Sequence, residues 1–131
     1  MTSDDLHALL AKPLDAIVAV DRPSGGPQVT PNWFVWDGEA FYLSTTRSRS
    51  KYPNIKRNPD ISIIVNDQAA HRYVAAYGRA EIVEDDYDTI ARLTIPIIEK
   101  YMPGGSQGFV ANLREQGRVV IVLRPDKLVT N

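Results

Sequence analysis

Residues 28–45 read QVTPNWFVWDGEAFYLST, and they carry the clearest structural signal in the chain. Residues 28–36 are rich in Val, Thr and aromatic side chains, which favour β-strands. The pair Asp37-Gly38 follows and is typical of a tight type I′ turn, in which both central residues need positive φ. Residues 40–45 predict the returning strand. The stretch therefore predicts an antiparallel hairpin, and the segments on either side continue the same kind of fold.

Four more strands are predicted outside this hairpin, at residues 16–20, 61–65, 73–83 and 118–124. Residues 119–123 are apolar at five consecutive positions, so the last strand is expected to be buried on both faces. Gly78 interrupts the 73–83 strand, which predicts a bulge or a close approach of another backbone. Six strands joined mostly by hairpins predict a mainly β fold, a small barrel rather than a doubly wound sheet.

Short helices are predicted between these strands. The first is capped by Ser3, carries Leu6, Leu9 and Leu10 on one face and ends at Pro13. A second begins at Ser48 or Ser50 and ends near residue 58. The apolar spacing of residues 85–101 predicts a longer helix that Pro96 kinks or splits. The acidic cluster at 84–88 would form its charged start. Residues 109–116 predict a short helix with Gly117 as its cap.

Composition limits the functional classes. The 131 residues fit one domain spanning residues 1–131, and 44% hydrophobic with 24% charged residues is typical of a folded globular protein. The absence of cysteine excludes disulfides, cysteine nucleophiles and Cys-type zinc sites. A net charge of −1 does not indicate a nucleic-acid-binding protein. Without a signal peptide or a long apolar run, we expect a cytoplasmic protein that makes no use of a membrane.

A basic segment follows the hairpin and predicts an anion site. The strand that ends at Ser44, Thr45 and Thr46 brings hydroxyl groups to the start of the second helix, beside Arg49, Ser50 and Lys51. A helix amino terminus flanked by Arg and Lys favours a phosphate group. Two alternatives stay open from the spacing alone: a solvated basic turn, and a small nucleic-acid patch, although five basic residues are few for a duplex binder.

The segment around Pro31 is the second unusual feature. Pro31 cannot donate to a β-ladder, so its strand is irregular or lies at an edge. Exposed carbonyl groups beside Trp33 could then hold a planar heterocycle. The alternative is that the aromatic residues, Phe34 and Trp36 above all, only fill the barrel core.

Common catalytic machinery is absent from the sequence. The two histidines, His7 and His71, have no second His at the spacing of metal ligands, and no Ser or Gly pattern matches a nucleophile elbow or a phosphate loop. We therefore predict no metal site. A phosphate pocket without acid–base apparatus suits chemistry supplied by a bound cofactor.

Several segments resemble one family, the flavin- and deazaflavin-binding split barrels related to pyridoxamine 5′-phosphate oxidase and the coenzyme F-420-dependent reductases. The matching segments lie in the same order and spacing from residue 15 onward: residues 26–29, Asp37-Gly38, 41–45, Arg49-x-Lys51-x-x-Asn54-Ile55-x-x-Asn58-Pro59, 61–63, 77–82 and 118–129.

The resemblance implies a six-stranded split β-barrel that forms a homodimer with two cofactor sites at the subunit interface. By match to the family, Arg49 and Lys51 would grip the cofactor phosphate, next to Ser44, Thr45, Thr46 and Ser50, with Asn54 one turn into the helix. The backbone of Pro31, Asn32 and Trp33 would lie along the tricyclic ring. His71 and Tyr73 are candidates for the ring or substrate pocket and for donating a proton.

A missing motif helps to decide which branch of the family the sequence resembles. Pyridoxamine phosphate oxidases carry an Arg-x-His motif near the carboxy terminus, and this sequence has none. The resemblance is closer to the deazaflavin reductases, which implies hydride transfer from reduced coenzyme F-420 to a small conjugated or heterocyclic acceptor. The alternatives are an FMN-binding oxidoreductase and a cofactor-binding protein without enzymatic activity.

Overall fold

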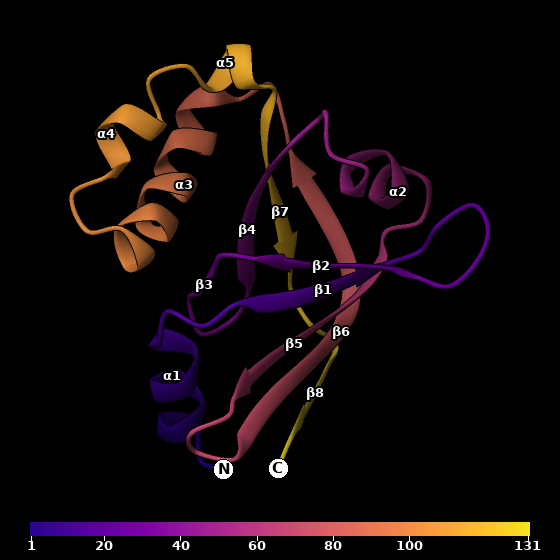
Figure 1. The fold of residues 1–131 in the computed structure, drawn as a ribbon, viewed down its shortest axis with the longest axis vertical. Helices are drawn as coiled ribbons and strands as arrows, with labels where there is room; N and C mark the ends of the chain where they lie inside the picture. Colours follow the sequence, from indigo (N-terminus) through magenta and orange to yellow (C-terminus); the bar gives the residue numbers. More distant parts are fainter.

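The computed structural model describes residues 1–131 and is a mainly β protein with accessory helices (Figure 1). All strand pairs are antiparallel, and the sheet order is β2-β1-β5-β6-β7-β4-β3, with β8 paired to β6. The sheet curls into a split barrel. Its strands are β1 (Ala16–Val20), β2 (Gln28–Asn32), β3 (Phe34–Trp36), β4 (Phe41–Thr46), β5 (Asp60–Asp67), β6 (Arg72–Val83), β7 (Arg118–Leu123) and β8 (Lys127–Thr130).

Five helices accompany the sheet: α1 (Ser3–Ala11), α2 (Lys51–Arg57), α3 (Tyr87–Tyr101), α4 (Ser106–Phe109) and α5 (Leu113–Gln116). The last three gather on one side of the barrel, beside β4 and β7 (Figure 1). None of the helices has the length and apolar character that a membrane crossing requires.

The buried residues form two clusters with β7 between them. The larger fills the barrel and includes Ile121 and Leu123, whereas the smaller lies under α3 and α5 and includes Val120 and Val122. Because side chains alternate along a strand, β7 sends one set into each cluster. Residues 119–123 are all buried, which confirms the prediction of a strand covered on both faces.

The predicted hairpin is present, but its turn is of a different type. Trp36 pairs with Phe41, so the connection has four residues rather than two. Of the pair Asp37-Gly38, only Gly38 has positive φ (101°), so a type I′ turn is excluded. The Asp37 side chain closes the loop instead, because its Oδ1 accepts hydrogen bonds from the backbone N–H groups of Glu39 and Ala40, each 2.8 Å long.

The number of strands exceeds the six predicted. Residues 28–36 are divided at Trp33 into β2 and β3, which pair with different neighbours, β1 and β4. In addition, the short edge strand β8 pairs with β6 near the carboxy terminus. Its only apolar residues are Leu128 and Val129, too few for an alternating pattern to be recognised.

The helices lie close to their predicted positions but differ from the predictions in detail. Thr2, not Ser3, caps α1, and it forms a reciprocal capping box with Asp5. Helix α2 follows Ser50, whose side chain makes no capping hydrogen bond.

Pro96 does not split α3, because it lies on the exposed side, where water can hydrogen-bond the freed carbonyl group. The region predicted as one helix at 109–116 is instead two short turns, α4 and α5, and Gly117 caps the second with φ 65°.

Gly78 marks the point where β6 changes partner. Residues before it pair with β8 and residues after it pair with β7. A Cβ atom at this position would lie 3.3 Å from the backbone O of Arg124 and 3.3 Å from the backbone N of Asp126. The predicted close backbone approach is therefore confirmed.

Candidate functional site

A cleft of about 820 Å³ opens between the barrel and the α3–α5 side, a volume typical of small-molecule sites. It is lined by β2, β4, the start of α2, α3, Phe109 of α4 and the region from Gln116 to Arg118. No acidic residue lines it. Nine of the ten predicted cofactor-binding residues do: Pro31, Asn32, Trp33, Ser44, Thr45, Thr46, Arg49, Ser50 and Lys51.

Lys51 is the most deeply placed cation of the cleft. Its residue is only 5% exposed, and its Nζ donates hydrogen bonds to Thr30 Oγ1 (2.7 Å) and to Asn32 Oδ1. Both acceptors are neutral. Burial, with a smaller contribution from the positive charge of Arg49, lowers the pKa of Lys51 to about 8. A negatively charged ligand would pair with the buried charge of Lys51, for which the protein supplies no carboxylate.

The basic residues of the 47–57 segment fall into two groups. Arg47, Lys56 and Arg57 each form an ion pair with a carboxylate, whereas Arg49 and Lys51 form none. The two unpaired residues are the two that line the cleft. The charges of this segment are therefore divided between a network of ion pairs and the cleft.

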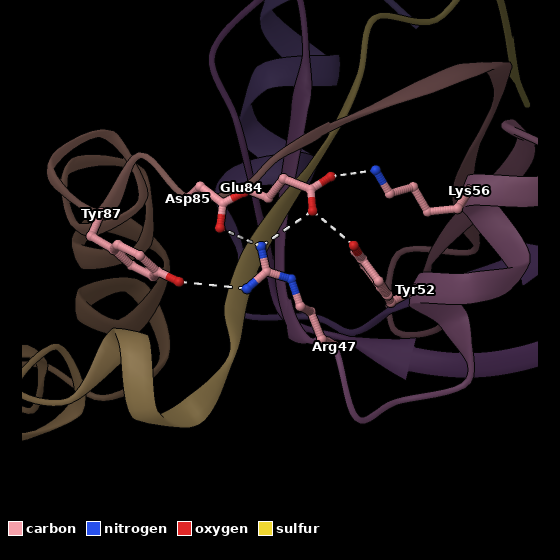
Figure 2. Close-up of polar contacts among 6 residues, drawn as sticks. All are labelled: Arg47, Tyr52, Lys56, Glu84, Asp85 and Tyr87. Carbon is pink, nitrogen blue, oxygen red and sulfur yellow. Dashed lines mark hydrogen bonds and ion pairs between the residues drawn. The ribbon is translucent and has the colours of Figure 1, made fainter.

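Glu84 is the centre of the structural network. Figure 2 shows its carboxylate between Lys56 and Arg47, with the Tyr52 hydroxyl donating to Oε1 at 2.7 Å. These hydrogen bonds, that from Lys56 first, lower the pKa of Glu84 to about 2. The prediction that the acidic cluster at 84–88 forms the charged start of α3 is confirmed for Asp86, which caps the helix, and for Asp88 in its first turn, but it is wrong for Glu84, which lies before the cap.

Asp85 completes this network. It has φ of 66° and accepts a 2.8 Å hydrogen bond from Arg47 (Figure 2). The Tyr87 hydroxyl, at the start of α3, accepts from the same guanidinium at 3.5 Å. The network therefore ties the end of β4 and helix α2 to the start of α3, the elements that carry the two sides of the cleft.

Arg118 is a cleft residue that the sequence prediction missed. Its guanidinium is half-buried, lies 4.8 Å from the centre of the Phe109 ring and donates to Gln116 Oε1 (3.1 Å) and Ser44 Oγ (3.4 Å). Only the pairing of β4 with β7, which places Arg118 opposite Thr46, brings it to the basic segment. No local sequence signal marks that pairing.

The irregular strand is held by Tyr101. The rings of Trp33 and Tyr101 stack with centres 4.7 Å apart and 1° between their planes. The Tyr101 hydroxyl donates to the backbone O of Leu14 (2.6 Å) and accepts from the backbone N–H of Phe34 (3.3 Å). Burial raises the pKa of this hydroxyl to about 12. Trp33 thus faces the cleft as a fixed ring, whereas Phe34 is 0% exposed and fills the core, as the alternative for that residue expected.

The remaining predicted residues lie outside the cleft lining. Asn54 donates a 3.1 Å hydrogen bond to Gln28 Oε1, and Gln28 itself lines the cleft. His71 lies in the turn between β5 and β6 with φ of 54°, and Asn131 brackets that turn by contacts with His71 and Tyr73. The turn lies beside the chain termini in Figure 1, away from α2 to α5. No group of three or more His, Asp or Glu side chains is close enough to hold a metal ion.

The comparisons with known proteins agree with this fold. Residues 3–130 match the pyridoxamine 5′-phosphate oxidase family. No curated protein matches the chain in sequence.

Three solved structures illustrate the similarity. An F-420 reductase is 33% identical, with a TM-score of 0.74 and 94% of each chain covered. A conserved hypothetical protein from Mycobacterium tuberculosis is 24% identical, with a TM-score of 0.84 over 99% of this chain and 84% of that one. A flavocytochrome from Azotobacter vinelandii is 20% identical, with a TM-score of 0.79 over 99% of this chain and 66% of the other.

These similarities extend over almost all of the chain, from α1 to β8, and they include the strands and helices that line the cleft. The family match and the identity to the F-420 reductase agree with the split barrel. The chain belongs to the pyridoxamine 5′-phosphate oxidase family.

Proposed function

We propose that this protein is a coenzyme F-420-dependent reductase that reduces a small conjugated or heterocyclic acceptor. The observation that carries the proposal is a cleft lined by Arg49, Lys51 and Arg118 and by no acid, next to the fixed ring of Trp33. Such a cleft suits a planar cofactor with a phosphate. The identity of 33% to an F-420 reductase supports F-420 over FMN as that cofactor.

The chain's own part in the reaction is binding and orientation. The bound cofactor supplies the hydride. Arg49 and Lys51 would bind the phosphate with charge-assisted hydrogen bonds, and the hydroxyls of Ser44 to Thr46 and of Ser50, which line the same cleft, would add neutral ones. The backbone of Pro31 to Trp33 would hold the ring. Holding the ring and the acceptor in contact is then the main source of rate enhancement.

No side chain of the cleft is a clear proton donor. The proton that completes a reduction comes from water or from His71 or Tyr73. Since neither of these two lines the cleft of its own chain, either would act in the cleft of a partner subunit.

The test is a titration of the purified protein with F-420 and with FMN, monitored by quenching of tryptophan fluorescence and by calorimetry. F-420 should bind more tightly than FMN, and reduced F-420 should be consumed in the presence of nitroaromatic or quinone acceptors. Tighter binding of FMN would favour the FMN-dependent alternative, and tight binding without turnover would favour a cofactor-binding protein.

A pair of variants tests the site itself. Each charge-assisted bond contributes about 1.5–3 kcal/mol, so Arg49→Ala with Lys51→Ala should weaken binding at least a hundredfold. Arg57→Ala is the matched control, because it removes a charge from α2 that is paired with Asp21 outside the cleft. Equal affinity in the double variant and the control would contradict this location of the site.

We also propose that the protein is a homodimer. Ile17 and Ile64 lie opposite each other on β1 and β5, on the outer face of the sheet, and are 36% and 38% exposed. Val29 of β2 and Tyr77 of β6 extend the same face and are 59% and 42% exposed. An apolar face that runs across four adjacent strands is typical of a surface covered by a second copy.

A further inference from the structure

Arg118 is half-buried, yet most of its N–H donors have no acceptor in the protein. A guanidinium has five N–H donors, and within the chain only two of them have acceptors, Gln116 Oε1 at 3.1 Å and Ser44 Oγ at 3.4 Å. The ring of Phe109 covers one face of the group at 4.8 Å. The other donors belong to a residue that lines the cleft and have no partner in the protein.

The charge of Arg118 is also uncompensated. The arginines at positions 47, 57, 72, 79 and 124 form ion pairs, and the other unpaired ones, at 22, 49, 92 and 114, are exposed to water. Arg118 alone is both unpaired and withdrawn from solvent. Partial burial of an unpaired charge is unfavourable, so such a group is expected where a ligand brings the opposite charge.

Arg118 belongs to the same electrostatic cluster as the two predicted phosphate residues. Burial, and after it the positive charge of Arg49, lowers the pKa of Arg118, and Arg49 acts in the same sense on Lys51. Arg49 therefore repels both Lys51 and Arg118 in a cleft that no acid lines. Meanwhile Glu84 and Asp85 neutralise Arg47 outside it (Figure 2). One singly charged group could not balance three cations.

We infer that Arg118 is the third cationic residue of the ligand site, and that with Arg49 and Lys51 it holds a ligand bearing two negative charges. The inference rests on the proposed function and adds to it a residue and a charge requirement. The two charges have two possible sources: a phosphate monoester, as on FMN, or a phosphodiester with a nearby carboxylate, as on F-420.

The experiment compares Arg118→Gln with Arg114→Gln. Arg114 is the matched control, since its guanidinium also lies over an aromatic ring, 4.5 Å from Tyr87, but does not line the cleft. Both variants lose one charge and one cation–π contact. Thermal unfolding is measured in phosphate and in chloride of equal ionic strength, and affinity is measured for F-420, FMN and riboflavin.

Arg118→Gln should lose most of the stabilisation by phosphate and bind the preferred cofactor ten- to a hundredfold more weakly, whereas Arg114→Gln should behave as wild type. A monoester source predicts that the loss is largest for FMN and absent for riboflavin, and a diester source predicts that it is largest for F-420. An Arg118→Gln variant with wild-type affinity for all probes overturns the inference.

Two further outcomes are informative. If wild type binds none of the probes, the proposed function fails together with this inference. If wild type binds a cofactor through Arg49 and Lys51 but Arg118→Gln binds it equally well, only the inference about Arg118 fails. Should Arg118→Gln lack the circular dichroism of the folded protein, Arg118→Met replaces it. That variant keeps the apolar stem but loses the charge, so an affinity at least tenfold below wild type supports the inference and an unchanged one overturns it.

Discussion

Lys51 illustrates how one buried residue can link ligand binding to pH. It is 5% exposed and hydrogen-bonded only to neutral oxygens of Thr30 and Asn32. In water a lysine keeps its proton to above pH 10, but here burial and Arg49 lower the pKa to about 8. The charge that attracts an anion is therefore lost as the pH rises through about 8, unless the anion is already bound.

The first prediction is that cofactor affinity falls with rising pH. Below pH 7 Lys51 is protonated in the free protein and the affinity should be constant, whereas between pH 8 and 9.5 it should fall by up to about tenfold per pH unit, because binding then requires uptake of a proton. Calorimetry across this range measures the effect. Lys51→Met should bind weakly with a flat profile, and a wild-type profile that is flat from pH 7 to 9.5 would contradict the prediction.

The stability of the free protein should show the opposite trend. The folded-state pKa of Lys51 is about 8 and its ordinary value is 10.5, so between these values the unfolded chain binds more protons than the folded one. Stability then rises with pH through this window as far as Lys51 is concerned. Lys100, half-buried and with its pKa lowered by burial to about 8, acts in the same direction.

At the scale of elements, the cleft depends on contacts that hold helices to strands. Glu84, at the end of β6, joins β4 and α2 through Arg47, Tyr52 and Lys56 (Figure 2). On the other side, Tyr101 fastens the last turn of α3 to the segment before β1 and to the start of β3. These two attachments fix the separation of the walls that the ligand must bridge.

Replacing Glu84 tests the first attachment. Glu84→Gln removes the charge shared by Arg47 and Lys56 and should lower the free energy of unfolding at pH 7 by about 1–3 kcal/mol. The pKa of Glu84 is lowered from 4.5 to about 2, so the wild type should lose this stabilisation as the pH falls from 4.5 to 2. Urea unfolding at several pH values measures both. Glu81→Gln is the control, because its pair with Arg124 is exposed and should contribute little.

Replacing Tyr101 tests the second attachment. Tyr101→Phe keeps the stack on Trp33 but leaves the Leu14 carbonyl and the Phe34 N–H without their partner, which should cost about 1–3 kcal/mol. We expect weaker cofactor binding and, in a Trp36→Phe background that leaves Trp33 as the only tryptophan, faster loss of fluorescence anisotropy. Tyr42→Phe is the control, since its hydroxyl donates only to Asp37 at an exposed turn outside the cleft. Equal stability of the two variants would count against a role for the Tyr101 hydroxyl.

Local sequence patterns predicted most of the helices and strands but not where these elements end. Residues 119–123 and the hairpin around Asp37 were predictable because apolar runs and turn residues act over a few positions. The break between β2 and β3 at Trp33 was not predictable, because it involves Tyr101. This residue is far away in the sequence, and its hydroxyl accepts a hydrogen bond from the Phe34 N–H. The Asp37 side chain similarly replaced the backbone geometry expected of the turn.

At the scale of the whole molecule, the prediction concerns assembly. Light scattering should give a mass of twice 14.6 kDa for the wild type. Ile64→Lys places a charge in the centre of the apolar sheet face and should shift the protein to monomer. Ile95→Lys is the matched control, because Ile95 is equally exposed, at 38%, but lies on α3. A monomeric wild type at micromolar concentration, or a dimeric Ile64→Lys variant, would contradict the proposed interface.

The candidate site could be predicted only as far as neighbouring residues define it. Ser44 to Lys51 are contiguous, so the family resemblance and the charge pattern found them together. Arg118 joins them through the register of β4 with β7, and Glu84 removes Arg47 from the cleft through a contact across 37 positions. Such long-range pairings decide which cations remain free, and composition or spacing does not reveal them.

The close packing at Gly78 limits which residues can occupy this position. Where β6 passes from β8 to β7, a methyl group would lie 3.1 Å from Leu123 Cδ1 and 3.3 Å from two backbone atoms that cannot yield as a side chain can. A saturation library at codon 78, sorted for soluble expression, should therefore return glycine almost alone, with alanine surviving at low yield. Codon 79, whose side chain is exposed, should accept many residues.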